Sequence, residues 1–73
     1  MKYTIFINEL GKIFEKKNVT ENTSLSTLNY DSLKILEILA FADKNFNDLK
    51  LDVNKLYDCK DIKDLVKLFK IKR

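Results

Sequence analysis

The sequence predicts an all-α fold of one domain, residues 1–73, built as a small four-helix bundle with a long first loop and a short third helix. Proline is absent and the one glycine is Gly11, whereas turns between strands usually need these residues. The chain is 45% hydrophobic and 34% charged, a balance typical of a folded domain. Apolar residues also recur at helical spacing. These observations favour helices over strands.

The first predicted helix spans residues 3–17. Its apolar residues follow the i, i+3, i+4, i+7 spacing of one helical face: Tyr3, Phe6, Ile7, Leu10, Ile13 and Phe14. Gly11 lies inside this helix, where glycine costs about 1 kcal/mol relative to alanine. We therefore expect another stretch of backbone to approach Gly11 closely.

Residues 18–30 are predicted to form a long loop, because asparagine, serine and threonine compete with helical backbone hydrogen bonds. A loop of this length in a small domain needs attachment to the core. Val19, Leu25 and Leu28 are the side chains expected to provide it.

The second predicted helix begins at Asp31-Ser32 and runs to about Phe46, with Asp31 as the N-cap that accepts a backbone N–H from Leu33 or Lys34. Its apolar residues form two stripes. One faces the core and contains Ile35, Ile38, Leu39, Ala42 and Phe46; the other contains Leu33, Leu36 and Ala40, beside Glu37. A helix that is apolar over so much of its surface is either central in the bundle or exposes the second stripe for binding.

After the second helix the pattern predicts a connector and then a short helix at 53–57, with Leu56 and Tyr57 facing inward. A last helix is predicted to begin at Asp61, with the acidic residue Asp64 three positions later. The expected core residues of the last helix are Ile62, Leu65, Val66 and Phe69. The basic residues that follow are expected to complement the helix dipole: Lys67, Lys70, Lys72 and Arg73.

The composition argues against several classes of function. Histidine is absent, which removes the commonest general base and metal ligand, and Cys59 alone cannot build a zinc site. We therefore expect neither an enzyme nor a metal site. A single cysteine also forms no internal disulfide, which favours the cytoplasm, and we expect Cys59 to be a small buried hydrophobe. No apolar run is long enough for a membrane span, and the middle of the chain lacks the basic stripe that nucleic-acid binding requires.

Ser32 has the position of a residue that another enzyme modifies. In the first turn of a helix its oxygen lies beside backbone N–H groups and the positive end of the helix dipole, where an attached phosphate would be stabilised. The chain supplies no histidine to deprotonate it, so an external enzyme would have to act. The alternative is an ordinary serine at a helix start.

The segment Asp31-Ser32-Leu33, followed by Leu36-Glu37-Ile38-Leu39 and Phe46, resembles the DSL segment and second helix of acyl carrier and peptidyl carrier proteins. Leu25 and Leu28 resemble the loop anchors of that family. Residues 56–65 are similar to the entry to its fourth helix, especially in peptidyl carriers. The resemblance spans nearly the whole chain and implies a bundle of acyl-carrier type.

The resemblance implies that the chain is a phosphoprotein in which Ser32 is the attachment site for 4′-phosphopantetheine from coenzyme A. Asp31 and Leu33 are the neighbours of that site. Leu33, Leu36, Glu37 and Ala40 would form the surface on which partner enzymes dock. The implied partners are a phosphopantetheinyl transferase, an acyl- or aminoacyl-activating ligase and downstream acyl-transfer enzymes. The chain would act as a cytoplasmic monomer that carries an acyl or aminoacyl thioester.

Three residues or pairs depart from the family pattern. Asn29 replaces a frequent glycine, although asparagine tolerates a left-handed conformation. Lys34 and Lys44 reduce the acidic character of the second helix, and Phe41 and Ala42 exchange sizes. The weakly charged second helix, together with the entry to the fourth helix that resembles peptidyl carriers, favours a dedicated pathway with a small acyl or amino acid cargo over fatty acid biosynthesis.

A helical protein-protein interaction module without a prosthetic group is the alternative function. There Leu33, Leu36 and Ala40 would bind a partner, and Ser32→Ala would leave activity intact. A small basic DNA-binding domain is a third possibility, and it predicts an affinity that falls steeply with salt.

Overall fold

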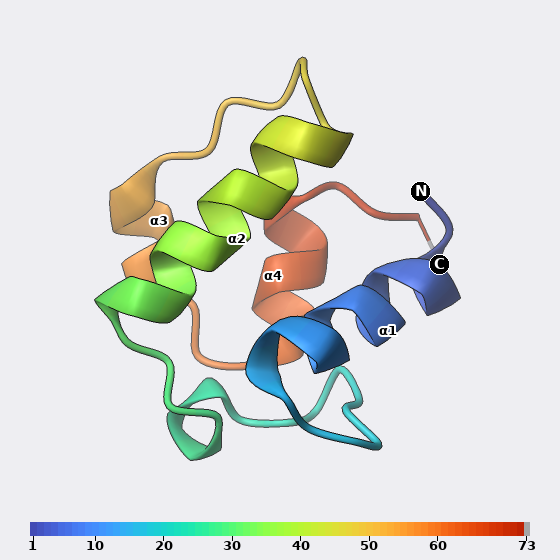
Figure 1. The fold of residues 1–73 in the computed structure, drawn as a ribbon, viewed down its shortest axis with the longest axis vertical. Helices are drawn as coiled ribbons and strands as arrows, with labels where there is room; N and C mark the ends of the chain where they lie inside the picture. Colours follow the sequence, from blue (N-terminus) through green and yellow to red (C-terminus); the bar gives the residue numbers. More distant parts are fainter. Residues whose placement is uncertain (73) are drawn as a thin grey trace.

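A computed structural model describes residues 1–72 and confirms the predicted all-α bundle (Figure 1). Its elements are α1 (Tyr3–Phe14), a single 3-10 turn η1 (Leu25–Thr27), α2 (Ser32–Asn45), α3 (Val53–Asp58) and α4 (Ile62–Leu68). Arg73, which the sequence analysis grouped with the basic tail, lies outside the described residues. Within those residues, no helix is both long and apolar enough to cross a membrane.

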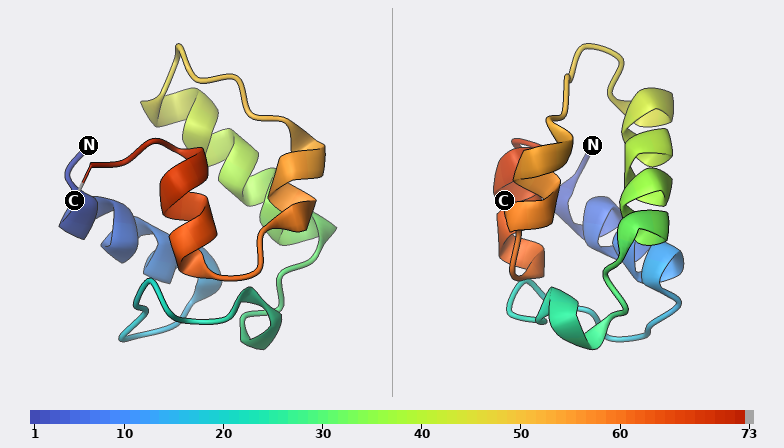
Figure 2. Two further views of the ribbon diagram at one scale, coloured as in Figure 1. Left: turned by 180° about the vertical axis from the view of Figure 1, so that it is seen from behind. Right: turned by 90° about the vertical axis from the view of Figure 1, so that its left-hand side faces the viewer.

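The core lies between two layers of helices. In the right-hand view of Figure 2, α2 occupies one side and α3 and α4 the other, with α1 between them. Every helix contributes buried side chains: Phe6, Leu10 and Phe14 from α1, Ile35, Ile38 and Ala42 from α2, Leu56 from α3, and Ile62, Leu65 and Val66 from α4. Phe6, Phe41, Phe46 and Phe69 form an aromatic cluster with ring centroids 5.0 to 6.5 Å apart. The apolar periodicity therefore predicted which helix faces pack on the core. Some residues of those faces are half-buried at its edge: Tyr3, Ile7, Ile13, Leu39 and Phe46.

The first helix ends at Phe14 and is shorter than the predicted 3–17. Glu15 takes a left-handed conformation with φ 54°, and the Lys16 N–H donates to the Gly11 carbonyl at 2.9 Å. This backbone turn closes the helix without the glycine that usually supplies the left-handed residue. A Cβ on Gly11 would lie 3.0 Å from the Lys16 carbonyl oxygen, which confirms the expected close approach of backbone.

The long first connection is attached to the body of the protein at several points. Val19, Leu25 and Leu28 are buried, as predicted. Its backbone also pairs with the start of α4: Leu25 N–H donates to the Lys60 carbonyl at 2.9 Å, and Ile62 N–H donates to the Thr23 carbonyl at 3.1 Å. The connection runs beneath α4 and α1 to the start of α2 (Figure 1). It is therefore an ordered part of the fold, and it contains the η1 turn that the sequence analysis did not predict.

The third and fourth helices depart from the prediction at their ends. Leu56 is buried as expected, but the Tyr57 side chain is 55% exposed and does not face inward, because it lies about 100° around α3 from Leu56, on the side away from the core. Asp61 caps α4 as predicted, accepting the Asp64 N–H at 3.0 Å. The helix ends at Leu68, with Lys70 left-handed at φ 57°, so Lys70 and Lys72 follow the helix and only Lys67 belongs to its last turn.

Candidate functional site

The start of α2 is fixed by Asp31, as the sequence predicted. The Asp31 carboxylate accepts the Lys34 N–H at 3.0 Å, and the Asp31 carbonyl accepts the Ile35 N–H at 3.0 Å. Asn29 precedes this cap in the left-handed conformation with φ 53°, which asparagine tolerates better than most residues. These features place Ser32 at the first position of the helix.

Ser32 is exposed, and its hydroxyl makes no hydrogen bond to any residue in the described range 1–72. The first N–H groups of a helix have no partner within the helix, and they carry the positive end of its dipole. A group attached to the Ser32 oxygen would therefore leave the protein surface beside donors that suit a phosphate. Because the Ser32 side chain is exposed, burial by residues 1–72 does not keep another protein away from this oxygen.

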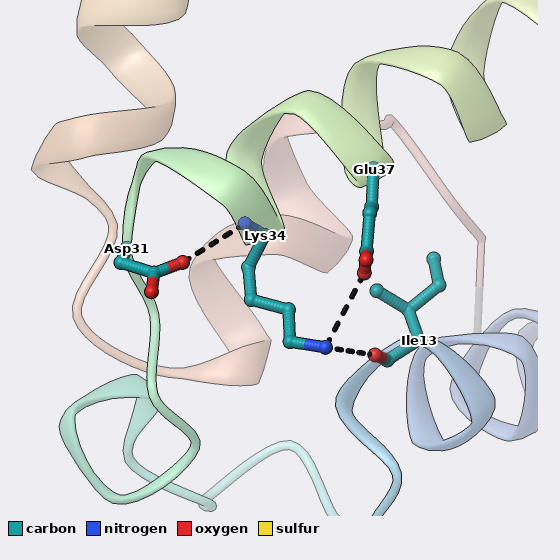
Figure 3. A network of polar contacts seen from close by, with 4 residues as sticks. All are labelled: Ile13, Asp31, Lys34 and Glu37. Carbon is teal, nitrogen blue, oxygen red and sulfur yellow. Dashed lines mark hydrogen bonds and ion pairs between the residues drawn. The ribbon is translucent and has the colours of Figure 1, made fainter.

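The residues two positions before and after Ser32 are tied to other helices. The Tyr30 hydroxyl donates to the Leu56 carbonyl in α3, and the Tyr30 ring lies 6.2 Å from that of Phe14. The Lys34 ammonium donates to the Ile13 carbonyl in α1 at 2.8 Å and pairs with Glu37 at 3.3 Å (Figure 3). Burial raises the pKa of Tyr30 well above its ordinary value, with smaller effects from Cys59 and Tyr57, so its hydroxyl keeps its proton at neutral pH.

The two apolar stripes of α2 have opposite surroundings. Ile35, Ile38 and Ala42 are buried. In contrast, Leu33 is 61% exposed and Leu36 is 62% exposed, and Ala40 and Glu37 are exposed on the same side. The second stripe is therefore a surface and is not part of the core. We call Leu33, Leu36, Glu37 and Ala40 the outer face of α2.

Sequence reasoning missed the orientation of Lys34. From sequence, Lys34 is one of the charges that reduce the acidity of α2, yet its side chain is only 18% exposed and its ammonium points to α1 (Figure 3). The partner is a backbone carbonyl in another helix, and no residue pattern reports such a contact. Among the charged residues from 31 to 37, Asp31 and Glu37 are therefore exposed and Lys34 is half-buried.

Cys59 lies between α3 and α4 and is half-buried, not fully buried as expected. Its thiol donates to the Lys55 carbonyl at 3.3 Å, which holds it at the rim of the core. Burial, together with the carboxylates of Asp64, Asp58 and Asp61, raises the pKa of Cys59 to about 11. A thiol of this pKa is a poor nucleophile at neutral pH, which agrees with the structural role expected for it.

Three curated relatives match the chain over most of its length. Proteins named acyl carrier protein from Lactococcus lactis, two from subspecies cremoris and one from subspecies lactis, are each 40% identical over 63 residues. The match covers 86% of this chain and 80% of each relative. No protein-family model and no solved structure matches the chain.

Proposed function

The chain belongs to the acyl carrier protein family, and from this premise we propose that it carries 4′-phosphopantetheine on Ser32 and presents an acyl or aminoacyl thioester to partner enzymes. Acyl carrier proteins are carriers and not catalysts, in agreement with the expectation that this chain is not an enzyme. The observation that carries the proposal is the exposed hydroxyl at the first position of α2, which has no hydrogen-bond partner among residues 1–72.

The residues around Ser32 suit a covalent phosphodiester. In the attachment reaction the Ser32 oxygen would form a bond to the phosphorus of coenzyme A that bears the pantetheine. The bond from this phosphorus to the bridging oxygen of the pyrophosphate would break, adenosine 3′,5′-bisphosphate would leave, and the serine proton would pass to a base on the transferase. One Asp31 oxygen caps the helix, and the other has no partner within residues 1–72 and remains free to help hold a magnesium ion brought by the transferase. The bound arm supplies the thiol that carries the acyl group, while the protein supplies a rigid mount.

The outer face of α2 would serve as the docking surface for these enzymes. Exposed leucines adjacent to the attachment site offer apolar contact area of the kind that anchors an interface. The face is small, which suits a carrier that must dissociate from one enzyme before it meets the next. We propose that a phosphopantetheinyl transferase, an acyl- or aminoacyl-activating ligase and downstream acyl-transfer enzymes use it in turn.

We propose a small acyl or amino acid cargo, as part of a dedicated pathway. The phenylalanine cluster supports this choice, because Phe6, Phe41 and Phe69 pack within 6.1 Å of one another between the helices. A long acyl chain that entered the bundle there would have to separate rings that already contact each other.

Intact mass measurement after incubation with a phosphopantetheinyl transferase and coenzyme A tests the attachment site. The wild-type chain should gain one phosphopantetheine, and Ser32→Ala should gain none. Ser26→Ala is the control, because Ser26 is also an exposed serine but lies in the single 3-10 turn η1 and contacts the Ser24 hydroxyl, and this variant should be modified like the wild type. An unmodified wild type, or equal modification of Ser32→Ala, would refute the proposal.

Thioester hydrolysis tests the cargo. With holo protein bearing either a butyryl or a decanoyl thioester, we expect both to hydrolyse in mild base as fast as a free pantetheine thioester of the same length. Marked protection of the decanoyl thioester alone would show that the bundle opens for long chains, and the small-cargo proposal would then be wrong.

A further inference from the structure

We propose that Tyr30 and Lys34 are positioning residues, which hold the segment around Ser32 between α1 and α3 so that the hydroxyl is delivered in one place to the attachment reaction. This inference rests on the proposed modification of Ser32. It assigns a role to two side chains that flank the serine at equal distance in sequence and reach opposite parts of the bundle.

The two hydrogen bonds have the same form. In each, a side chain from residues 30–34 donates to a backbone carbonyl of another helix: Tyr30 to Leu56 in α3, and Lys34 to Ile13 in α1. Ile13 belongs to the last turn of α1, whose carbonyls lack partners within the helix, so the Lys34 ammonium satisfies one of them at the negative end of the dipole. Both acceptors are backbone carbonyls, so substitution of the Leu56 or Ile13 side chain would not remove them.

The Lys34 contact is sheltered from solvent, which distinguishes it from an ordinary surface ion pair. Its side chain is 18% exposed, whereas Lys12, which pairs with Glu9 at 3.7 Å, is 76% exposed. Hydrogen bonds from charged donors are stronger when they are partly desolvated. The Lys34 bond should therefore restrain the first turn of α2, and the Lys12 pair should restrain little.

The physical reason for two attachments is the weakness of a helix end. The first turn of a helix frays unless side chains cap or pack it, and Ser32 lies in that turn. Asp31 holds the turn to its own helix, whereas Tyr30 and Lys34 hold it to the rest of the protein. Loss of either bond should lower the fraction of docked carriers whose hydroxyl lies within reach of the reacting phosphorus. Docking itself should change little, because both leucines of the outer face of α2 stay in place. Loss of the Lys34 side chain alters that face only by releasing Glu37 from its ion pair, and the Glu37 side chain is 43% exposed, where such a pair contributes little.

Transferase kinetics on Tyr30→Phe and Lys34→Met test the inference, with coenzyme A saturating and the carrier concentration varied. Each variant should lower kcat by about fivefold, the factor that corresponds to one hydrogen bond of ordinary strength, while KM for the carrier changes by less than about twofold. The double variant should lose more than either alone. Far-ultraviolet circular dichroism confirms that each variant is folded.

Two variants provide matched controls. Tyr3→Phe removes the same hydroxyl from the bond between Tyr3 and Glu21, which is remote in sequence from Ser32. Lys12→Met removes a lysine that also pairs with a glutamate one turn away. Both should keep the wild-type kcat. Losses in the controls equal to those in Tyr30→Phe and Lys34→Met, or an effect confined to KM, would overturn the inference.

Amide hydrogen exchange provides a measurement that needs no transferase. The Lys34 and Ile35 amides are bonded to Asp31, and their exchange should accelerate by about fivefold in Tyr30→Phe and in Lys34→Met, because the turn opens more often. Unchanged exchange would also overturn the inference. If the wild-type chain accepts no phosphopantetheine, the proposed function fails, and exchange still reports whether the two bonds hold the turn.

Discussion

The two faces of α2 differ in surroundings although they are built from similar residues. Ile38 is fully buried, and Leu36, two positions earlier on the same helix, is 62% exposed. Burial of a large aliphatic side chain contributes about 1.5–3 kcal/mol, which the exposed leucine forgoes. The inner face therefore contributes to the stability of the fold, and the outer face leaves apolar surface exposed, where we propose that partner enzymes dock. The difference shows that the hydrophobic content of a helix does not indicate which of its residues form the core.

Ile38→Ala would disturb the inner face most. We expect it to lower the free energy of unfolding by about 2–5 kcal/mol, through lost transfer energy and a residual cavity, which is a large share of the stability of so small a domain. Urea unfolding followed by circular dichroism measures the change. A loss below about 1 kcal/mol would mean that the inner face is less well packed than its burial indicates.

Leu36→Ala makes the matched change on the outer face. It should leave the free energy of unfolding within about 0.5 kcal/mol of the wild type, because the side chain is exposed. The KM of the phosphopantetheinyl transferase for the carrier should rise by about tenfold, as expected for the loss of an interface anchor. Equal loss of stability in Leu36→Ala and Ile38→Ala would abolish the distinction between the faces.

Asp31 supports both faces because it caps the helix to which they belong. Asp31→Ala should lower the free energy of unfolding by about 1 kcal/mol, the usual contribution of an N-cap. Asp31→Asn retains a capping oxygen and should be more stable than Asp31→Ala, but it loses the carboxylate proposed to assist attachment. Thermal unfolding and transferase turnover, measured on both variants, separate the two roles; equal stability of the variants would argue against capping by the side chain.

The burial of Cys59 lies between that of the inner face and that of the outer face of α2. Titration of its thiol therefore measures how strongly partial burial disfavours the charged form. Its pKa is raised from the ordinary 9.0 to about 11, so the folded state retains the proton that the unfolded state loses. This contribution to stability is complete below about pH 9 and is lost as the pH rises to about 11. The difference in unfolding free energy between the wild type and Cys59→Ala should shrink over that interval. A difference that stays constant would mean that the thiol is not shielded.

The sequence predicted those parts of the fold that depend on side-chain pattern. The caps at Asp31 and Asp61, the loop anchors Leu25 and Leu28, and the inner face of α2 follow from residue type and spacing. The end of α1 was not predicted, because the left-handed residue there is Glu15, whereas glycine usually occupies this position and marks the end of a helix in the sequence. Lys70 ends α4 in the same way.

The candidate site was predicted only in part, for a related reason. The exposure of Leu33 and Leu36 could not be distinguished from burial by periodicity, because both stripes have the same spacing. The inward turn of Lys34 depends on a carbonyl that another helix brings within 2.8 Å. Contacts of this kind are set by the tertiary arrangement, and local sequence carries no record of them.

The backbone hydrogen bonds between the first connection and the start of α4 have a consequence for synthesis. They join segments far apart in the chain, and contacts of that kind form only after a long stretch has closed, which slows their formation. The ribosome makes α2 well before α4, so Ser32 emerges while the loop that precedes it still lacks its partner. The transferase should therefore accept the newly made chain only after α4 has left the ribosome and folded back.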